Sequence, residues 1–529
     1  MRRRTVLQGL AAAAGASLVP SAWGETKPGR WLMAESPNFI LYSTEPDDQT
    51  RAEIIALERY HALMLRLKPR AAQDHPKISI FIAASRRDMA ATAPWADTGV
   101  AGFYHARLEQ VRAVTLPDAA ESLRGGSAGH RTLGSARTDA RPLDAGVILF
   151  HEYAHHVART DTTVIYPPWY QEGFAEFLST AEFTDTTANI GKFTISRASW
   201  LANGSWLDIN TFLGGLPDRT TTDDIAQFYA QAWLATHYLF GEKTRAAGFN
   251  KYCAALQNGG DPLGAFEPAF GITPAVFDKE LRDYKRKAIN SWQFPDKPTD
   301  MASRVTLTRL EAAADDILMP LSYLKSLPDA ADADRAIATI RAEAKKYPDS
   351  LFANRAHALL EIWYGDLGVA RTKLDALLLK EPQSPETLHL SGLCDLRSSY
   401  AAEDQDLAKK AKKSFAAAQR LDPTRAGSLF RYFESSLIET GEVSQHLLDV
   451  LVTAYNLSPQ VDDIALNAAQ ALIAHKQFED AIYILRPMVG DVHNTGRAEI
   501  AKQLIDGAKA EQIDSFILFG SASGTDDEE

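Results

Sequence analysis

The segment Val147–Val157 contains the pattern H-E-x-x-H within a run of apolar residues that predicts a helix. On an α-helix, positions i and i+4 lie on one face, so His151 and His155 can present two imidazoles to a single metal ion. Glu152 lies one step around the helix, where its carboxylate can reach a water on that metal. The alternative is a core helix whose histidines bond to the backbone.

A second segment, Pro167–Phe177, supplies a candidate third ligand. A catalytic zinc ion usually has three protein ligands and keeps one position for water. Glu172 falls in the first turns of a helix that we expect to begin at the prolines. Gly173 has no side chain, so we expect this helix to approach the helix of the two histidines closely. Glu176 is four residues farther on the same face, where it can accept an N–H from a ligating histidine.

H-E-x-x-H followed by W-x-x-E-G-x-A-E-F resembles the gluzincin metallopeptidases, the superfamily of the thermolysin-like and aminopeptidase-N-like enzymes. The pattern is most similar to the bacterial peptidase-MA-like group, and the resemblance covers roughly residues 30–290. It implies an α+β zincin-like domain that binds Zn²⁺ through His151, His155 and Glu172, with Glu152 as general base. Glu176 would orient one of the two histidines from outside the ligand set.

A third segment, Phe228–Gly241, is similar to the gluzincin helix whose leading tyrosine stabilises the transition state. The resemblance implies that the Tyr229 hydroxyl donates to the oxyanion formed when water attacks a carbonyl. The alternative is an ordinary core stripe of Tyr229, Trp233 and His237 at helical spacing. The aminopeptidase motif G-x-M-E-N is absent before residue 151, and the corresponding stretch, Gly102–Arg107, has no acidic residue. Exopeptidase and endopeptidase activity therefore both stay open.

The composition is that of a soluble globular protein, with 45% hydrophobic and 23% charged residues over a length of 529. The net charge of −12 argues against nucleic acid as a partner. Cys253 and Cys394 have no metal-ligand spacing, and we interpret both as small buried residues rather than a disulfide.

The first 24 residues resemble a twin-arginine-type signal peptide, because Arg2–Gln8 carries paired arginines ahead of a short, alanine-rich apolar stretch. The alternative is a membrane anchor that is not cleaved. No other stretch is apolar and long enough to span a bilayer, so the mature protein is expected in the periplasm or outside the cell.

Residues 25–142 predict an N-terminal α+β sheet part, with strands at 38–43 and 77–83, a hairpin at 100–116 and a helix at 47–67. Residues 143–290 predict the zinc-binding helical part, and 291–314 a linker. The glycine-rich stretch 117–142 is either a flap over the site or a disordered surface insert.

The C-terminal part has a repeat, since Pro348 and Pro382 stand 34 residues apart, the tetratricopeptide period. We expect an all-α tetratricopeptide-like solenoid of four to five helical pairs over 315–510, which could bind a protein partner on its concave face. An irregular helical bundle is the alternative. Residues 511–529 form a tail that should be disordered at its end.

These patterns together predict a zinc-dependent hydrolase that acts on a peptide or protein substrate. The alternative is an inactive gluzincin-like domain in a tetratricopeptide-repeat scaffold that binds protein partners. The intact Glu152 favours the enzyme, because a domain without activity would not need this residue for its structure.

Overall fold

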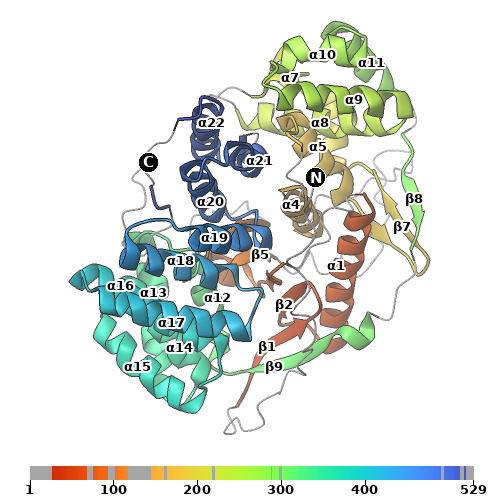
Figure 1. The fold of residues 1–529 in the computed structure, drawn as a ribbon. Helices are drawn as coiled ribbons and strands as arrows, with labels where there is room; N and C mark the ends of the chain where they lie inside the picture. Colours follow the sequence, from red (N-terminus) through yellow and green to blue (C-terminus); the bar gives the residue numbers. More distant parts are fainter. Residues whose placement is uncertain are drawn as a thin grey trace.

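A mixed α/β N-terminal part is followed by a long all-helical C-terminal region in the computed structural model (Figure 1). This arrangement agrees in outline with the expected order of fold classes. The expected signal peptide (1–24), the loop at 117–142 and the end of the tail lie outside the described residues. The structure describes residues 27–67, 75–92, 102–116, 145–159, 164–216, 221–287, 289–296, 301–489, 494–512 and 517–519.

A six-stranded sheet forms the centre of the N-terminal part, in the order β4-β5-β3-β2-β1-β9. The strands are β1 (Pro28–Glu35), β2 (Phe39–Ser43), β3 (Ile78–Ile82), β4 (Gly102–Ala106), β5 (Val111–Thr115) and β9 (Thr306–Glu311). Strand β3 is buried at every position and pairs in parallel with β2 and β5, as expected for a strand covered on both faces. The predicted hairpin is confirmed as the antiparallel pair β4–β5, and β4 is an edge strand.

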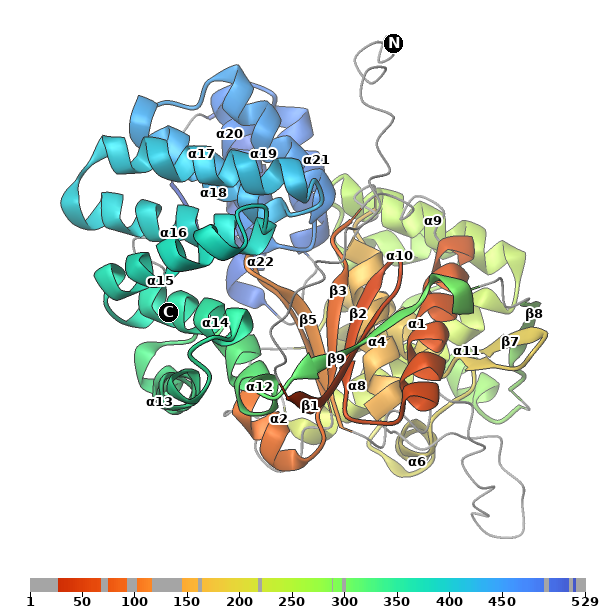
Figure 2. The same ribbon diagram turned by 90° about the horizontal axis from the view of Figure 1, so that it is seen from below.

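Helices cover both faces of this sheet (Figure 2). Helices α1 (Asp47–Leu67) and α4 (Ala145–Arg159) pack on one face, where the Tyr60 and Phe150 rings stack with centroids 4.0 Å apart. Helices α2 (Arg86–Thr92) and α12 (Ala314–Leu324) pack on the other face. The sheet therefore holds α4, which carries the H-E-x-x-H pattern, along one of its faces.

Helix α5 (Pro168–Ser179) packs between α4 and α8 (Thr222–Phe240). Further helices and a small sheet with the order β6-β7-β8 complete this part of the chain. They are β6 (Glu182–Phe183), β7 (Thr187–Ile190), α6 (Ile195–Asn203), α7 (Ile209–Gly214), α9 (Lys243–Gln257), α10 (Pro262–Phe270), α11 (Pro274–Tyr284) and β8 (Trp292–Pro295). Helix α8 ends just before Gly241, and α9 ends shortly before Gly259 and Gly260.

The expectation of a linker at 291–314 is wrong. Strand β8 pairs with β7, and β9 pairs with β1, so this segment joins two sheets. The two apolar residues of β9, Leu307 and Leu310, are three positions apart, so the period-two signal of a strand is missing from Thr306–Glu311. Strand β9 covers the edge of β1, which would otherwise present unpaired backbone groups.

The C-terminal region consists of helices that pack each on the next. The helices are α13 (Ala330–Lys346), α14 (Leu351–Tyr364), α15 (Leu367–Lys380), α16 (Pro385–Ala402), α17 (Gln405–Leu421), α18 (Ala426–Thr440), α19 (Gln445–Leu457), α20 (Asp462–Ala474), α21 (Phe478–Val489) and α22 (Thr495–Lys509). Pro348 and Pro382 each lie just beyond the end of a helix, as the repeat pattern predicts, and Pro423 does so as well. None of the helices in the described parts of the chain is both long and apolar enough to cross a bilayer.

A buried cluster of charges joins the β4–β5 turn to the C-terminal helices. Arg431 on α18 donates from Nη2 to Glu109 Oε1 at 3.1 Å and from Nη1 to Glu434 Oε2 at 2.8 Å. His389 Nε2 lies 2.9 Å from the other Glu109 oxygen. Burial alone would raise the pKa of Glu109, but His389 and Arg431 lower it to about 2. The C-terminal region is thus docked on the sheet by fully paired buried charges.

Candidate metal centre

The two histidines of the H-E-x-x-H pattern face each other on α4. His151 Nε2 and His155 Nε2 lie 3.1 Å apart, as the i, i+4 spacing on a helix predicts. The opposite side of α4 is buried, since Tyr153 and Ala154 pack in the core beneath the sheet. His156 points away and shares a hydrogen bond of 2.6 Å with the Tyr104 hydroxyl. The packing of α4 therefore fixes the direction of both imidazoles.

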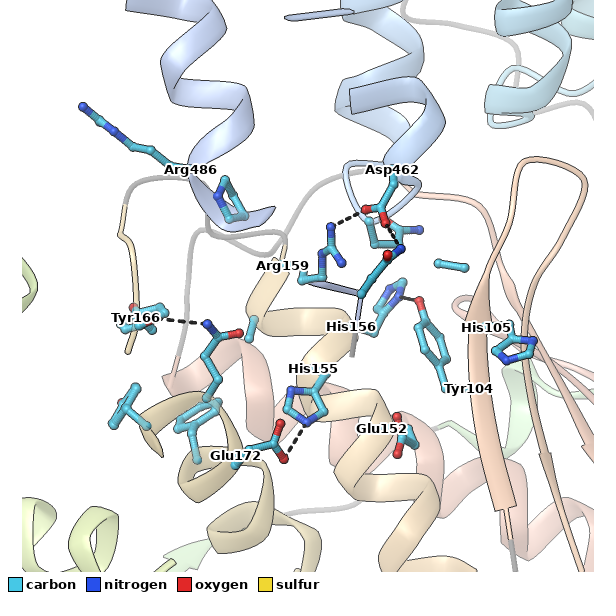
Figure 3. A pocket seen from close by; sticks show the side chains of 18 of the residues that line it. Tyr104, His105, Glu152, His155, His156, Arg159, Tyr166, Glu172, Asp462 and Arg486 are labelled. Carbon is cyan, nitrogen blue, oxygen red and sulfur yellow. Dashed lines mark hydrogen bonds and ion pairs between the residues drawn. The ribbon is translucent and has the colours of Figure 1, made fainter. Parts of the chain in front are cut away.

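Glu172 completes a three-residue group with His151 and His155. Its Oε2 atom is 3.3 Å from His151 Nε2 and 3.4 Å from His155 Nε2. One ligand atom from each of the three residues lies within 4.8 Å of the others. Figure 3 shows Glu172 and His155 meeting at the base of a cleft. The structure thus brings together the three residues that the sequence singled out as metal ligands.

Gly173 allows α5 to pack closely on another helix, but that helix is not the one that the sequence predicted. A Cβ atom at this position would lie 2.2 Å from both the Ala232 carbonyl oxygen and the Thr236 hydroxyl of α8. The glycine therefore allows close contact between α5 and α8. The sequence predicted close contact with α4 instead. Because α8 supports α5 from behind, Glu172 is held against the two histidines.

Glu176 bonds to the other ring nitrogen of His151, as expected for an orienting carboxylate. Its Oε1 lies 3.3 Å from His151 Nδ1. Arg197 on α6 donates to both oxygens of this carboxylate, from Nε at 2.8 Å and from Nη2 at 2.7 Å. Burial would raise the pKa of Glu176, but Arg197 and His151 lower it to about 2. The carboxylate is therefore ionised and fixed by a bidentate arginine.

The surroundings of His151 stabilise positive charge. Burial would lower the pKa of this imidazole, but Glu172 and Glu176, one at each ring nitrogen, raise it to about 10. A divalent cation on Nε2 would take the place of the proton beside Glu172, while the Nδ1–H would still donate to Glu176. The donor set of two imidazoles and one buried carboxylate fits a zinc ion.

Replacing Glu176 by Gln should weaken metal binding by about 10–100-fold, because His151 would lose the carboxylate that fixes its ring. Competition with a chromophoric chelator measures this affinity. Glu182→Gln is a matched control, since Glu182 lies in β6 of the neighbouring small sheet and pairs with Lys192. Equal affinities in the two variants would remove Glu176 from its orienting role.

Tyr229 lies beside His151 rather than on the cleft wall. The two rings are 6.1 Å apart between centroids, and the Arg197 guanidinium lies 5.0 Å from the Tyr229 ring centroid. Burial and the nearby Glu172 raise the pKa of Tyr229, which keeps its hydroxyl protonated. His237, two turns farther on α8, is a core residue, with Nδ1 2.9 Å from the Tyr284 hydroxyl and Nε2 3.1 Å from the Asn290 carbonyl.

A cleft of about 400 Å³ opens beside the group and includes Glu152 in its lining. Edge strand β4 forms one wall, and α4 and α5 form the base (Figure 3). The C-terminal helices supply a further wall, which the sequence did not predict. There Arg159 Nη2 lies 2.5 Å from Asp462 Oδ1, and Asn494 donates to the other oxygen of Asp462 at 3.1 Å.

Arg197 and the wall around Asp462 are the parts of the site that sequence reasoning missed. Arg197 stands at no recognisable spacing from Glu176, and Asp462 follows Arg159 by about three hundred residues.

Comparison of the chain with protein-family models, with curated proteins and with solved structures finds no significant match. The chemistry of the site is therefore inferred from the residues that form it.

Proposed function

We propose that the chain is a zinc-dependent hydrolase of peptide bonds, with His151, His155 and Glu172 as metal ligands and Glu152 as general base. The observation that carries this proposal is the convergence of the three ligand atoms, from two neighbouring helices, within 4.8 Å of one another. They lie at the base of a cleft that Glu152 also lines. The same residues support a zincin-like fold of the gluzincin type, in the peptidase-MA-like group.

Two imidazoles and one carboxylate are the protein ligands of many catalytic zinc sites, which keep a further position open. When bound, zinc supplies a Lewis acid that lowers the pKa of a water and polarises the substrate carbonyl. His155 and Glu172 line the cleft, so that an open position on the metal would be reached from the cleft. The placement of the ligands therefore supports a catalytic rather than a purely structural role.

Glu152 lies next to His151 in sequence but outside the three-residue group, and its side chain lines the cleft. Its carboxylate accepts a proton from the attacking water and passes it to the nitrogen of the leaving amine. Tyr229, held beside His151 with a protonated hydroxyl, is the proposed donor to the developing oxyanion. This role needs a small movement of Tyr229 toward the cleft when substrate binds.

Strand β4 supports a peptide as the substrate. It pairs with β5 on one side and is the last strand at this edge of the six-stranded sheet. An extended peptide can add to such an edge by backbone hydrogen bonds. Because Tyr104 and His105 of β4 line the cleft, a peptide on this edge would pass over the candidate metal ligands.

The proposal is tested by removing and restoring the metal. The purified protein should cleave casein or unblocked peptides, lose this activity after dialysis against a strong chelator and regain it with one equivalent of Zn²⁺. A chain dialysed against buffer alone is the control. Cleavage that survives complete removal of the metal would contradict the proposal.

We also propose that α13 to α22 are tetratricopeptide-like pairs that bind a protein partner. The support is the packing of each helix on the next and the prolines that follow α13, α15 and α17. Small residues allow close packing in these pairs, since a Cβ atom on Gly392 of α16 would lie 2.7 Å from the Phe415 ring of α17. This assembly function is compatible with a catalytic N-terminal part.

A further inference from the structure

The described end of the chain, Ile517–Phe519, is bound along helix α20 by side-chain amides. Gln470 accepts from the Ile517 N–H at 2.7 Å and donates to the Ile517 carbonyl at 2.8 Å. Asn467 accepts from the Phe519 N–H at 3.2 Å and donates to the Phe519 carbonyl at 3.0 Å. Each amide thus pairs with both backbone groups of one residue.

The two amide residues and the two residues that they bind have spacings that suit a helix paired with an extended segment. Asn467 and Gln470 are three residues apart and lie on one face of α20. Ile517 and Phe519 are two residues apart, so in an extended segment their backbone groups point to the same side. Because the Asn467 and Gln470 amides contact only backbone groups of the segment, these hydrogen bonds do not depend on its sequence.

Selectivity comes from the side chains of the bound segment. Phe519 lies under the Arg497 guanidinium of α22, which is 5.1 Å from the ring centroid. Leu518 and Phe519 also pack on the apolar cluster of the last helices. Ile517, in contrast, is 61% exposed. Apolar residues are therefore favoured at the positions of Leu518 and Phe519, whereas the position of Ile517 tolerates many residues.

The amides that hold this segment are buried parts of α20. Asn467 is 0% exposed and Gln470 is 8% exposed. These values apply with Ile517–Phe519 in place, and a buried amide that lost this segment would lose its hydrogen bonds to the segment's backbone at a cost in free energy. The residues Asn467, Gln470 and Arg497 are called the tail groove below.

We propose that the tail groove is a binding site for an extended peptide segment of a partner protein, with two adjacent apolar residues, and that Ile517–Phe519 is its intramolecular ligand. The partner segment would replace the chain's own segment and form the same amide pairs. This inference does not depend on the proposed hydrolysis.

The tail groove is connected to the cleft through the first turn of α20. Arg497 pairs with Asp463 at 3.2 Å, and the preceding Asp462 pairs with Arg159 of α4. Arg159 is one helical turn beyond His155 on α4. A partner bound in the groove would therefore lie next to the wall of the cleft that holds the candidate metal ligands.

The test uses a fluorescent peptide with the sequence of residues 514–521. The full chain should bind it weakly, because its own tail competes at a high effective concentration. Phe519→Asp in the full chain removes the apolar anchor of the tail and should tighten peptide binding by about tenfold or more. A chain that ends at Gln512 should bind the peptide at least as tightly as this variant.

Adding Asn467→Ala and Gln470→Ala to the Phe519→Asp chain should abolish the gain, whereas Gln503→Ala on the exposed face of α22 should not. Circular dichroism establishes that each variant has kept its helical content. Peptide binding that is the same in the wild type and the Phe519→Asp chain would overturn the proposal. Binding that survives the loss of both amides would also overturn it.

Discussion

Glu152→Gln is expected to lower the rate of peptide hydrolysis by about 10²–10⁴-fold without loss of the metal. The glutamine has the same size as the glutamate but cannot accept the proton of the attacking water. Glu152 lines the cleft and is not one of the three residues whose ligand atoms converge, so the metal should stay bound. The measurements are kcat/KM on unblocked peptides and the metal content of the same preparation.

Glu267→Gln, on the exposed side of α10, is the control for this substitution and should keep full activity. A Glu152→Gln variant with wild-type activity would rule out Glu152 as the base. Joint loss of metal and activity would instead make Glu152 a metal ligand, which the geometry of the three-residue group does not predict.

Arg431→Ala is expected to lower the free energy of unfolding by about 3–5 kcal/mol. The variant leaves the Glu109 and Glu434 carboxylates without their arginine, and their side chains are 4% and 0% exposed. Because Glu109 lies in the β4–β5 turn, the contact between the sheet and α18 should be the first to open. Urea denaturation and limited proteolysis measure the two effects.

Arg420→Ala on the exposed side of α17 is the matched control and should change stability by less than about 0.5 kcal/mol. Adding Glu109→Gln and Glu434→Gln to Arg431→Ala should restore part of the loss, since the buried charges are then removed together. An Arg431→Ala chain as stable as the control would show that this cluster does not hold the C-terminal region on the sheet.

The sequence was most informative where the signal is local. Helical periodicity alone places His151 and His155 on one face of α4, and the structure has their Nε2 atoms 3.1 Å apart. Period-two and helical patterns likewise predicted β2, α1, β3 and the β4–β5 hairpin within a residue or two of their bounds. Glu172 was found because it belongs to the next helix and to a recognisable pattern.

Features that depend on distant pairing could not be found in this way. Strand β9 pairs with β1 across the whole N-terminal part, and its six residues carry no period-two pattern that would predict a strand. The orientation of Gly173 toward α8 depends on how three helices pack. Arg197 acts on His151 only through Glu176, and nothing in its own sequence neighbourhood distinguishes it from a surface arginine.

The most direct test of the account is the metal content of the purified chain compared with that of a Glu172→Ala variant. Elemental analysis should find one zinc per wild-type chain and much less than one in the variant, because Glu172 Oε2 lies 3.3 and 3.4 Å from the two histidine nitrogens and completes the ligand set. Circular dichroism of both proteins controls for folding. A folded wild-type chain that binds no divalent metal, or a variant that keeps all of it, would contradict the proposed centre.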